Sequence, residues 1–370
     1  MRRGNGWLVA ALVAGPALTG GARLAAQDSE FGIRSLGTPG RWESVRARAT
    51  AGAFAPFDPL SPLTEAPLAD LGHITATAMA STSWRTVTIG DTSSALRATR
   101  FPLMLLAGQV APRLALAAGF TTYLDKSWDV TTRDSVVLRG VTERYTDEFA
   151  SDGSVADLRL AAASRVSPRL ALGAAAHVLT GSARLSAQRT FDDTIYHAVR
   201  QTSDVRYDGL GVSGSALLGL APGLSVALWG RADNRLRAKV AGATTAETDL
   251  PRMVGGGVRL APSPSVRLAA AAAWRSWSHA GPGSFNTWSW SAGSELGGGP
   301  SPIRLGVRWG QLPFGPGPTA PTEFAVAAGT VRTFSQGHAL IDFALERLER
   351  KGSGLDERLW TLLVGITVRP

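Results

Sequence analysis

Apolar residues alternate with small or polar ones along most of the chain. In the stretch 170–178 every second residue is Leu, Ala or Val, and the residues between them are small or polar. The stretches 113–129, 223–240, 303–309 and 360–368 show the same period of two. Successive side chains of a β-strand point to opposite faces, so this period predicts strands. Little of the chain shows helical periodicity, which indicates an all-β protein.

Short turns centred on Pro or Gly separate these stretches. The phrase RVSPRLAL at 165–172 nearly repeats QVAPRLAL at 109–116, and looser copies follow at 220–226 and 260–266. Longer polar links stand between the short turns. Short turns that alternate with long loops are typical of outer-membrane barrels, whose short turns face the periplasm. The links that we expect to be long are 126–151, 189–203, 240–250 and 310–322.

Alternation alone fits two architectures. A soluble sandwich buries its apolar face, whereas a membrane barrel turns that face to lipid and its charges into the lumen. Many of the alternating stretches have ten or more residues, which is enough for a tilted membrane span, and this length favours the barrel. A closed barrel also pairs every backbone polar group within the lipid. The turns predict an antiparallel barrel of about fourteen strands, near 73–89, 95–108, 113–130, 153–165, 169–190, 203–220, 223–240, 251–260, 265–277, 285–296, 302–310, 323–333, 338–350 and 357–369.

The first 26 residues have the composition of a secretory signal peptide. Arg2 and Arg3 precede a short apolar run at 7–18, and small residues follow near Ala26. A retained membrane anchor is the alternative. We therefore divide the chain into a leader at 1–26, a segment at 27–72 and a barrel at 73–370. This division places the protein in the outer membrane of a Gram-negative-type bacterium, in contact with outer-membrane lipid and lipopolysaccharide.

The composition argues against several kinds of binding site and partner. The chain has no cysteine, which excludes disulfides and zinc–thiolate sites. Its net charge is +9, and loss of Arg2, Arg3 and Arg23 with the leader would leave +6. These charges are interspersed rather than clustered, so we expect no nucleic-acid partner. The five histidines form no close ligand pair, so we expect no metal and no cofactor.

The segment 27–72 alternates poorly and carries its own motifs. It contains AGAF at 51–54, then Asp58, Ser61 and EAPLA at 65–69. This order resembles the FadL-type outer-membrane transporters of fatty acids and aromatic hydrocarbons, which often open with an AGAF-like stretch and an NPAGLA-like motif. The strand count and YLDKSWDV at 123–130 extend the resemblance over the mature chain. Two departures are the replacement of Asn-Pro-Ala-Gly by residues 65–68 and the absence of a C-terminal aromatic residue.

The resemblance implies that residues 27–72 plug the lumen and that a ligand leaves through a gap in the barrel wall. A disordered tail is the alternative, but the apolar residues of this segment favour the plug. The implied function is passive uptake of small hydrophobic or amphipathic molecules by a monomer without catalysis. A scaffold barrel without a through-path is the alternative function. The candidate ligand-binding residues are Phe54, Phe57, Trp229, Arg231 and Arg235.

Basic residues on the inward face of the predicted strands have two interpretations. They could attract an anionic group of a ligand, or they could pair with Asp157, Asp233, Asp342 and Glu346 and hold the wall and plug together. We favour the second interpretation. Each such charge would cost roughly 2–4 kcal/mol if it faced lipid near the midplane. The residues expected to face the lumen are Arg159, Arg231, Arg235, Arg237, Lys239, Arg267, Arg275, Arg304 and Arg308.

Three remaining patterns favour a structural role. The GxGxxG match at 209–214 lies within an alternating strand, so its glycines are expected to keep the inner wall small rather than to bind a dinucleotide. His177 would need a serine and an orienting polar group to act in a barrel enzyme, and no motif supports that role. Tryptophans near the strand ends are expected to form interfacial girdles. These are Trp84, Trp128, Trp274, Trp277, Trp288, Trp290, Trp309 and Trp360.

Overall fold

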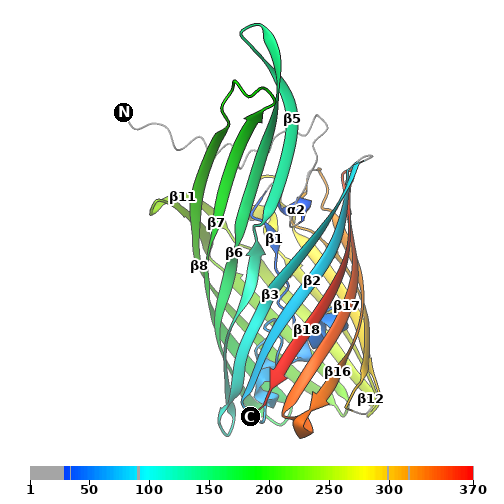
Figure 1. Ribbon diagram of the computed structural model, residues 1–370. Coiled ribbons are helices and arrows are strands. Elements are labelled where there is room, and N and C mark those ends of the chain that lie inside the picture. The colour runs from blue at the N-terminus through cyan, green and yellow to red at the C-terminus, as the bar shows by residue number, and fades with distance from the viewer. Residues whose placement is uncertain (1–28, 34, 90–91, 298–299, 316, 370) are drawn as a thin grey trace.

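The protein forms a closed antiparallel β-barrel around its own N-terminal segment (Figure 1). The structure is a computed structural model that describes residues 29–33, 35–89, 92–297, 300–315 and 317–369. The leader assigned to residues 1–26 lies outside this part of the chain. The wall closes where β18 pairs with β2 over 14 register positions, from Leu355–Ile89 to Val368–Ala76.

Fourteen wall strands run through the described residues, as the alternation predicted. Three of them consist of two segments each, namely β4 with β5, β9 with β10, and β11 with β12. The bounds are β2 (Thr75–Ile89), β3 (Thr92–Ala111), β4 (Leu114–Asp125), β5 (Trp128–Leu138), β6 (Val141–Ser167), β7 (Leu170–Phe191), β8 (Val199–Ala221), β9 (Leu224–Asp233), β10 (Arg235–Val240), β11 (Ala243–Asp249), β12 (Arg252–Ser263), β13 (Val266–Arg275), β14 (Thr287–Leu296), β15 (Ile303–Gln311), β16 (Thr322–Phe334), β17 (Ala339–Gly352) and β18 (Leu355–Val368).

The two ends of the barrel differ. Short turns and the C-terminus lie at one end, whereas β5 to β8 rise well above the rest of the wall at the other (Figure 1). The strands β6 and β7 have 27 and 22 residues, about twice the length that crosses a bilayer. The short-turn end is therefore taken as periplasmic and the tall end as extracellular.

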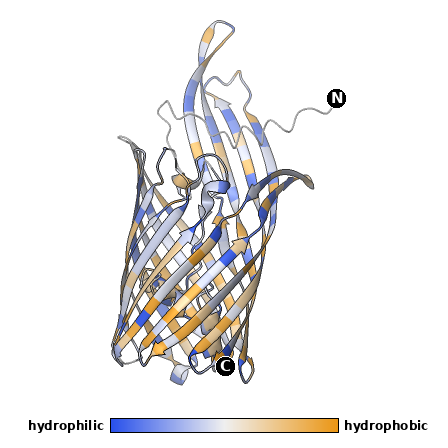
Figure 2. Ribbon diagram, turned by 180° about the vertical axis from the view of Figure 1, so that it is seen from behind, coloured by the Kyte–Doolittle hydropathy of each residue, from blue (hydrophilic) through white to orange (hydrophobic). Residues whose placement is uncertain are grey.

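The outer face carries the apolar half of the alternation. Figure 2 shows hydrophobic residues gathered over the lower wall, whereas the tall strands carry more hydrophilic ones. Leu228 is 59% exposed, and Leu160 and Val254 also point outward. Five of the expected girdle tryptophans are exposed on this face: Trp84, Trp288, Trp290, Trp309 and Trp360.

The expectation that Trp277 belongs to the interfacial girdle is wrong. Trp277 is 3% exposed and contacts Phe314 edge to face in the interior, with ring centroids 5.3 Å apart. Trp277 follows β13 in a 3₁₀ turn, η3 (Trp277–His279). The strand alternation therefore no longer governs the direction of its side chain.

Asn234 inserts one extra residue into the wall strand formed by β9 and β10. On one side of it Asp233 pairs with Gly211, and on the other side Arg237 pairs with Asp208. From the first pair to the second, the chain therefore advances four residues along β9 and β10 but only three residues along β8. Such a bulge reverses the in-and-out alternation of the residues that follow it.

Arg235, Arg237 and Lys239 consequently lie on the outer face. Leu236 between them is buried in the lumen cluster, whereas the Arg235 side chain is 63% exposed. The prediction that these three basic residues face the lumen is wrong, because it carried the alternation of β9 unbroken through Asn234.

The N-terminal segment crosses the lumen in short pieces. These are α2 (Glu30–Ile33), β1 (Thr38–Pro39), α3 (Val45–Ala49), η1 (Ala55–Phe57) and η2 (Ala66–Asp70). Helix α3 packs against β15 to β18, η1 against β9 and β12, and η2 against β6 to β8. The segment therefore meets opposite sides of the wall. No helix among the described residues has the length and apolar character needed to traverse a bilayer.

Candidate functional site

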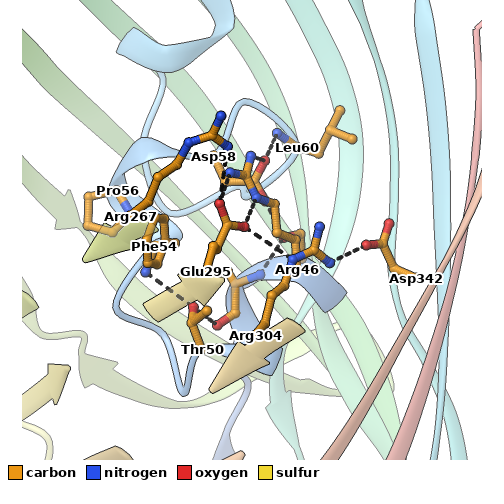
Figure 3. Close-up of polar contacts among 12 residues, drawn as sticks. Arg46, Thr50, Phe54, Pro56, Asp58, Leu60, Arg267, Glu295, Arg304 and Asp342 are labelled. Atoms are coloured by element: carbon orange, nitrogen blue, oxygen red, sulfur yellow. Dashed lines mark hydrogen bonds and ion pairs between the residues drawn. The ribbon is translucent and has the colours of Figure 1, made fainter. Parts of the chain in front are cut away.

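Glu295 on the barrel wall forms an ion pair with Arg46 of helix α3 (Figure 3). Arg46 donates from Nε and Nη2 to the two carboxylate oxygens of Glu295 on β14, each at 2.7 Å. Glu295 also accepts from Nε of Arg304 at 3.1 Å and lies 3.5 Å from Arg267. Arg304 then pairs with Asp342 on β17. The two parallel bonds of Arg46 fix the orientation of the segment as well as its distance from the wall.

The start of α3 explains how Arg46 reaches Glu295. Ser44 caps the helix, because its hydroxyl oxygen accepts from the backbone N–H of Ala47 at 3.1 Å and its proton is donated to Asp58. Asp58 lies 3.9 Å from Arg46. Burial alone would lower the pKa of Arg46, but its hydrogen bonds with Glu295 and the charge of Asp58 raise this pKa above its usual value. Arg46 therefore stays charged.

A second wall carboxylate binds two further arginines of the segment. Glu346 on β17 accepts from Nη1 of Arg41 at 2.7 Å and 2.9 Å, and from Arg48 at 3.1 Å and 3.2 Å. Its side chain is 1% exposed. Arg41 has another partner in Glu43, at 3.2 Å. The predicted pairing of Asp342 with an inward wall arginine is confirmed, whereas the partners of Glu346 come from the segment and not from the wall.

On the opposite side of the segment, Asp70 pairs with Arg165 on β6 in an exposed position, and the buried carboxylate is Glu65. Its Oε1 accepts from Arg159 on β6 at 3.0 Å and from the Ser213 hydroxyl at 2.6 Å, and its Oε2 accepts from Ser215 at 2.7 Å. The Ser215 oxygen in turn accepts from the backbone N–H groups of Glu65 and Ala66, at 2.8 Å and 2.9 Å. Glu65 stands where the FadL-type motif has Asn, and sequence reasoning missed its role.

His177 joins this anchor to a buried aspartate. Its Nδ1 lies 2.9 Å from Asp157, and its Nε2 lies 2.8 Å from the Ser213 hydroxyl. Ser213 has a single proton, which it donates to Glu65, so Nε2 must donate to Ser213. Nδ1 faces a carboxylate and donates as well. The chain of bonds continues from Asp157 to Arg231 at 2.6 Å.

Ser213, His177 and Asp157 have the order of a serine-hydrolase triad, although no sequence motif indicated it. A nucleophilic serine gives its proton to the histidine and faces the carbonyl to be attacked. Here the Ser213 proton goes to Glu65, and that carboxylate lies where a carbonyl would have to approach. The arrangement thus binds the segment to the wall. Among the described residues, no three His, Asp or Glu side chains gather in a way that could hold a metal ion.

Wall glycines stand where the segment comes closest. A Cβ added to Gly173 on β7 would lie 2.5 Å from the Cβ of Glu65, and one added to Gly306 on β15 would overlap the backbone of Thr50. Gly211 in turn makes room for the Asp233 carboxylate. The expectation that the GxGxxG glycines keep the inner wall small is consistent with this contact.

Aromatic side chains fill the extracellular half of the lumen. Trp42 of the segment stacks on Tyr123 of β4, with ring centroids 5.6 Å apart. The Arg231 guanidinium lies 4.5 Å from the Trp42 ring centroid, and Trp229 belongs to the same buried cluster. The indole N–H groups of Trp42, Trp229 and Trp277 are buried and have no acceptor among the described residues. Buried donors without acceptors are costly, so this cluster favours an added acceptor.

A cavity of about 130 Å³ lies beside this cluster. Its lining includes Trp229, Leu63, Arg275 and Arg308. Arg275 donates to the Met253 sulfur at 3.4 Å and lies 5.3 Å from the Trp42 ring, but it forms no ion pair with any described residue. A second cavity, of about 220 Å³, opens on the periplasmic side of α3 and is lined by Met79, Leu103 and the Arg46–Glu295 group. The segment separates the two cavities.

The structure does not bring the five predicted ligand-binding residues together. Trp229 lines the upper cavity. Phe54 and Phe57 are buried against small wall residues such as Ala171 and Ala227, and neither ring lines the two cavities. Arg231 pairs with Asp157 and Asp233, although its Nη2 has no acceptor among the described residues, and Arg235 faces outward. Arg275 is the cation without a carboxylate partner that lines the upper cavity among the described residues, and the alternation had already placed it in the lumen.

Solved structures with the same fold include a FadL homologue and two hydrocarbon transport proteins. The chain matches a FadL homologue from Pseudomonas aeruginosa with a TM-score of 0.63, 13% identity and coverage of 90% of this chain and 99% of that one. The monoaromatic hydrocarbon channel CymD matches with a TM-score of 0.58, 14% identity and coverage of 90% and 98%. The toluene transporter TodX of P. putida matches with a TM-score of 0.60, 11% identity and coverage of 89% and 99%.

No protein-family model and no curated protein sequence matches the chain. The likeness is therefore one of architecture, and it covers nearly the whole length of each channel. The predicted resemblance is confirmed at this level: the chain has the fold of the FadL-type hydrophobic-compound channels.

Proposed function

We propose that the protein is a passive outer-membrane channel for small hydrophobic or amphipathic molecules, such as aromatic hydrocarbons or fatty acids. Residues 29–71 act as its plug, and the barrel works as a monomer among outer-membrane lipids. The shared fold with channels described as carrying toluene and monoaromatic hydrocarbons supports this function. The Ser213–His177–Asp157 group serves as an anchor, and no catalysis is proposed.

The aromatic cavity with its unpaired donors carries the proposal. Trp229 offers an apolar face and an unpaired N–H, and Arg275 offers a cation without a carboxylate. A ligand with an apolar body and one acceptor group would cover the ring and satisfy both donors. Passage to the lower cavity then requires the plug to shift, because α3 and η1 separate the two spaces.

Uptake by whole cells tests the function. Cells that lack their own transporter receive this barrel, and entry of labelled toluene and of a labelled long-chain fatty acid is measured. Trp229→Leu and Arg275→Gln should slow uptake. Trp288→Leu and Arg358→Gln are matched controls, because both residues are exposed on the outer wall. If the two lumen variants and the controls behave alike, the cavity is not the ligand site.

A scaffold without a through-path is the second candidate function. It is favoured by the ion pairs that hold the segment to the wall, through Glu65, Glu295 and Glu346. Heat-modifiable migration shows whether the barrel is folded. A folded barrel that admits neither compound would support the scaffold over the channel.

A further inference from the structure

A hollow of about 760 Å³ lies on the outer wall where the β10–β11 hairpin begins. We call it the outer groove and define it by Arg235, Arg237, Glu247, Arg252, Trp274 and His279. The hairpin projects sideways from the wall at the extracellular end (Figure 1). Six of the seven β11 residues are exposed, as expected for a strand that leaves the barrel surface.

The side chains of the outer groove point away from the lumen. Met253 is buried and pairs with Arg231 inside, so its neighbour Arg252 points outward. Trp274 pairs directly with Val254, which is 54% exposed on the lipid-facing side. The bulge at Asn234 adds the guanidinium groups of β10 to this same face.

The groove lies at the upper edge of the apolar belt. Below it on the outer face follow Leu228 of β9 and Val254 and Val258 of β12, all exposed. Above it the outward residues of β8, β10 and β11 are polar or charged. Trp274 lies where the outer face changes from apolar to polar, as tryptophans do at a membrane–water interface. The groove is thus level with the headgroups of the outer leaflet.

Carboxylates and arginines are balanced in the lining of the groove, which also includes Asp233 and Asp249, but one arginine has no carboxylate partner. Arg235 pairs with Glu247 and Asp249, and Arg237 contacts Glu247 and Asp208. Arg252 forms no ion pair with any described residue, and His279 is exposed beside it. Exposed pairs of this kind are weak, so a phosphate can replace their carboxylates at little cost.

We propose that the outer groove binds the phosphate of an outer-leaflet lipid headgroup, with the acyl chains of that lipid along Leu228 and Val254. The arginines bind the phosphate, Trp274 covers the glycerol or sugar region, and the apolar wall below accepts the chains. The apolar belt directly below the cations favours a lipid over a free phosphate ion. This site rests on the outer-membrane placement in the proposed function but does not depend on transport.

Native mass spectrometry of the detergent-solubilised barrel tests the site. The probes are diphosphorylated lipid A, the same lipid without phosphates, and inorganic phosphate. We expect one diphosphorylated lipid to bind, and the double variant Arg237→Gln/Arg252→Gln to weaken this binding by about tenfold or more. Arg358→Gln is the matched control, since it is an outward arginine that is 60% exposed and lies near Glu349 on another part of the wall.

A variant with the opposite expected effect sharpens the test. Glu247→Gln removes a carboxylate that competes for Arg235 and Arg237, so it should tighten lipid binding. Equal binding of the phosphate-free lipid would overturn the proposal, as would an equal loss in Arg358→Gln or tightly bound inorganic phosphate alone. Uptake is measured separately, so a wild-type barrel that binds no diphosphorylated lipid but supports normal uptake would refute the groove and leave the channel function standing.

Discussion

The two sides of the N-terminal segment are attached to the barrel with opposite polarity. Toward β14 and β17 the segment supplies Arg41, Arg46 and Arg48, and the wall supplies the carboxylates. Toward β6 and β8 the segment supplies two carboxylates. Glu65 meets Arg159 and two serine hydroxyls of the wall, and Asp70 pairs with Arg165 in a more exposed position. The first side has several buried ion pairs, whereas the second has one buried carboxylate, Glu65, beside the more exposed Asp70–Arg165 pair. This difference shows which side can be released by a single change.

Among the substitutions considered, Glu65→Gln should weaken the attachment of the segment to the wall the most. It keeps the shape of the side chain but leaves Arg159 buried without its charged partner, at a cost of about 3–5 kcal/mol. We expect the barrel to remain heat-modifiable while the segment becomes open to protease and the pore conductance in planar bilayers rises.

The double variant Glu65→Gln/Arg159→Met supplies the control for this effect. Removing both charges of a buried pair is often close to neutral, so protease protection should return. Protection that stays lost in the double variant would mean that the hydrogen bonds to Ser213 and Ser215, rather than the charge pair, hold this side.

Glu346→Gln should loosen the other side to a smaller extent. Arg48 loses its carboxylate, but Arg41 keeps Glu43 as a partner and Arg46 keeps Glu295, so the segment stays attached on this side. The loss should be about 1.5–3 kcal/mol, the usual value for hydrogen bonds to a charged group. Hydrogen exchange of residues 44–50 should accelerate while that of residues 65–70 stays unchanged. Equal acceleration of both stretches would show that the two attachments act as one.

Gly173→Ala tests the tight side by crowding instead of charge. The new Cβ would press on the Cβ of Glu65 and on the backbone nitrogen of Ala66, at an expected cost of about 1–3 kcal/mol. Gly214→Ala is the control, because its nearest contact would be an ordinary 3.6 Å. Thermal unfolding monitored by segment proteolysis should separate the two variants, and identical curves would contradict the close packing.

Lys126 should give the smallest effect, and one that depends on pH. Its Nζ donates to the Leu36 carbonyl at 2.9 Å in the loop between β4 and β5, and burial lowers its pKa to about 8. Below pH 8 the folded state carries a buried charge that the unfolded chain carries in water. Attachment of residues near 36 should therefore strengthen by about 1 kcal/mol between pH 7 and pH 8.5. Lys126→Met should abolish this change in hydrogen exchange.

The sequence predicted the barrel because alternation is a local property of each strand. It placed fourteen strands, the inward direction of Arg231, Arg275 and Arg304, and the exposure of five girdle tryptophans. It did not predict that Ser213, His177 and Asp157 meet, because contact across strands depends on register, which a single strand does not encode. It also passed over Glu65, although an isolated acid between the apolar residues of 54–69 was the available signal.

The wrong prediction for Arg235, Arg237 and Lys239 follows from how residue positions along a strand are assigned to its two faces. A strand assigns its residues to two sides by odd and even position, so one insertion exchanges the two sets for everything beyond it. Loss of Asn234 would direct three cations inward and turn Leu236 toward water, without changing any other residue. Length in this wall strand therefore carries as much information as composition, and a homologue that differs there by one residue would present a different surface to its surroundings.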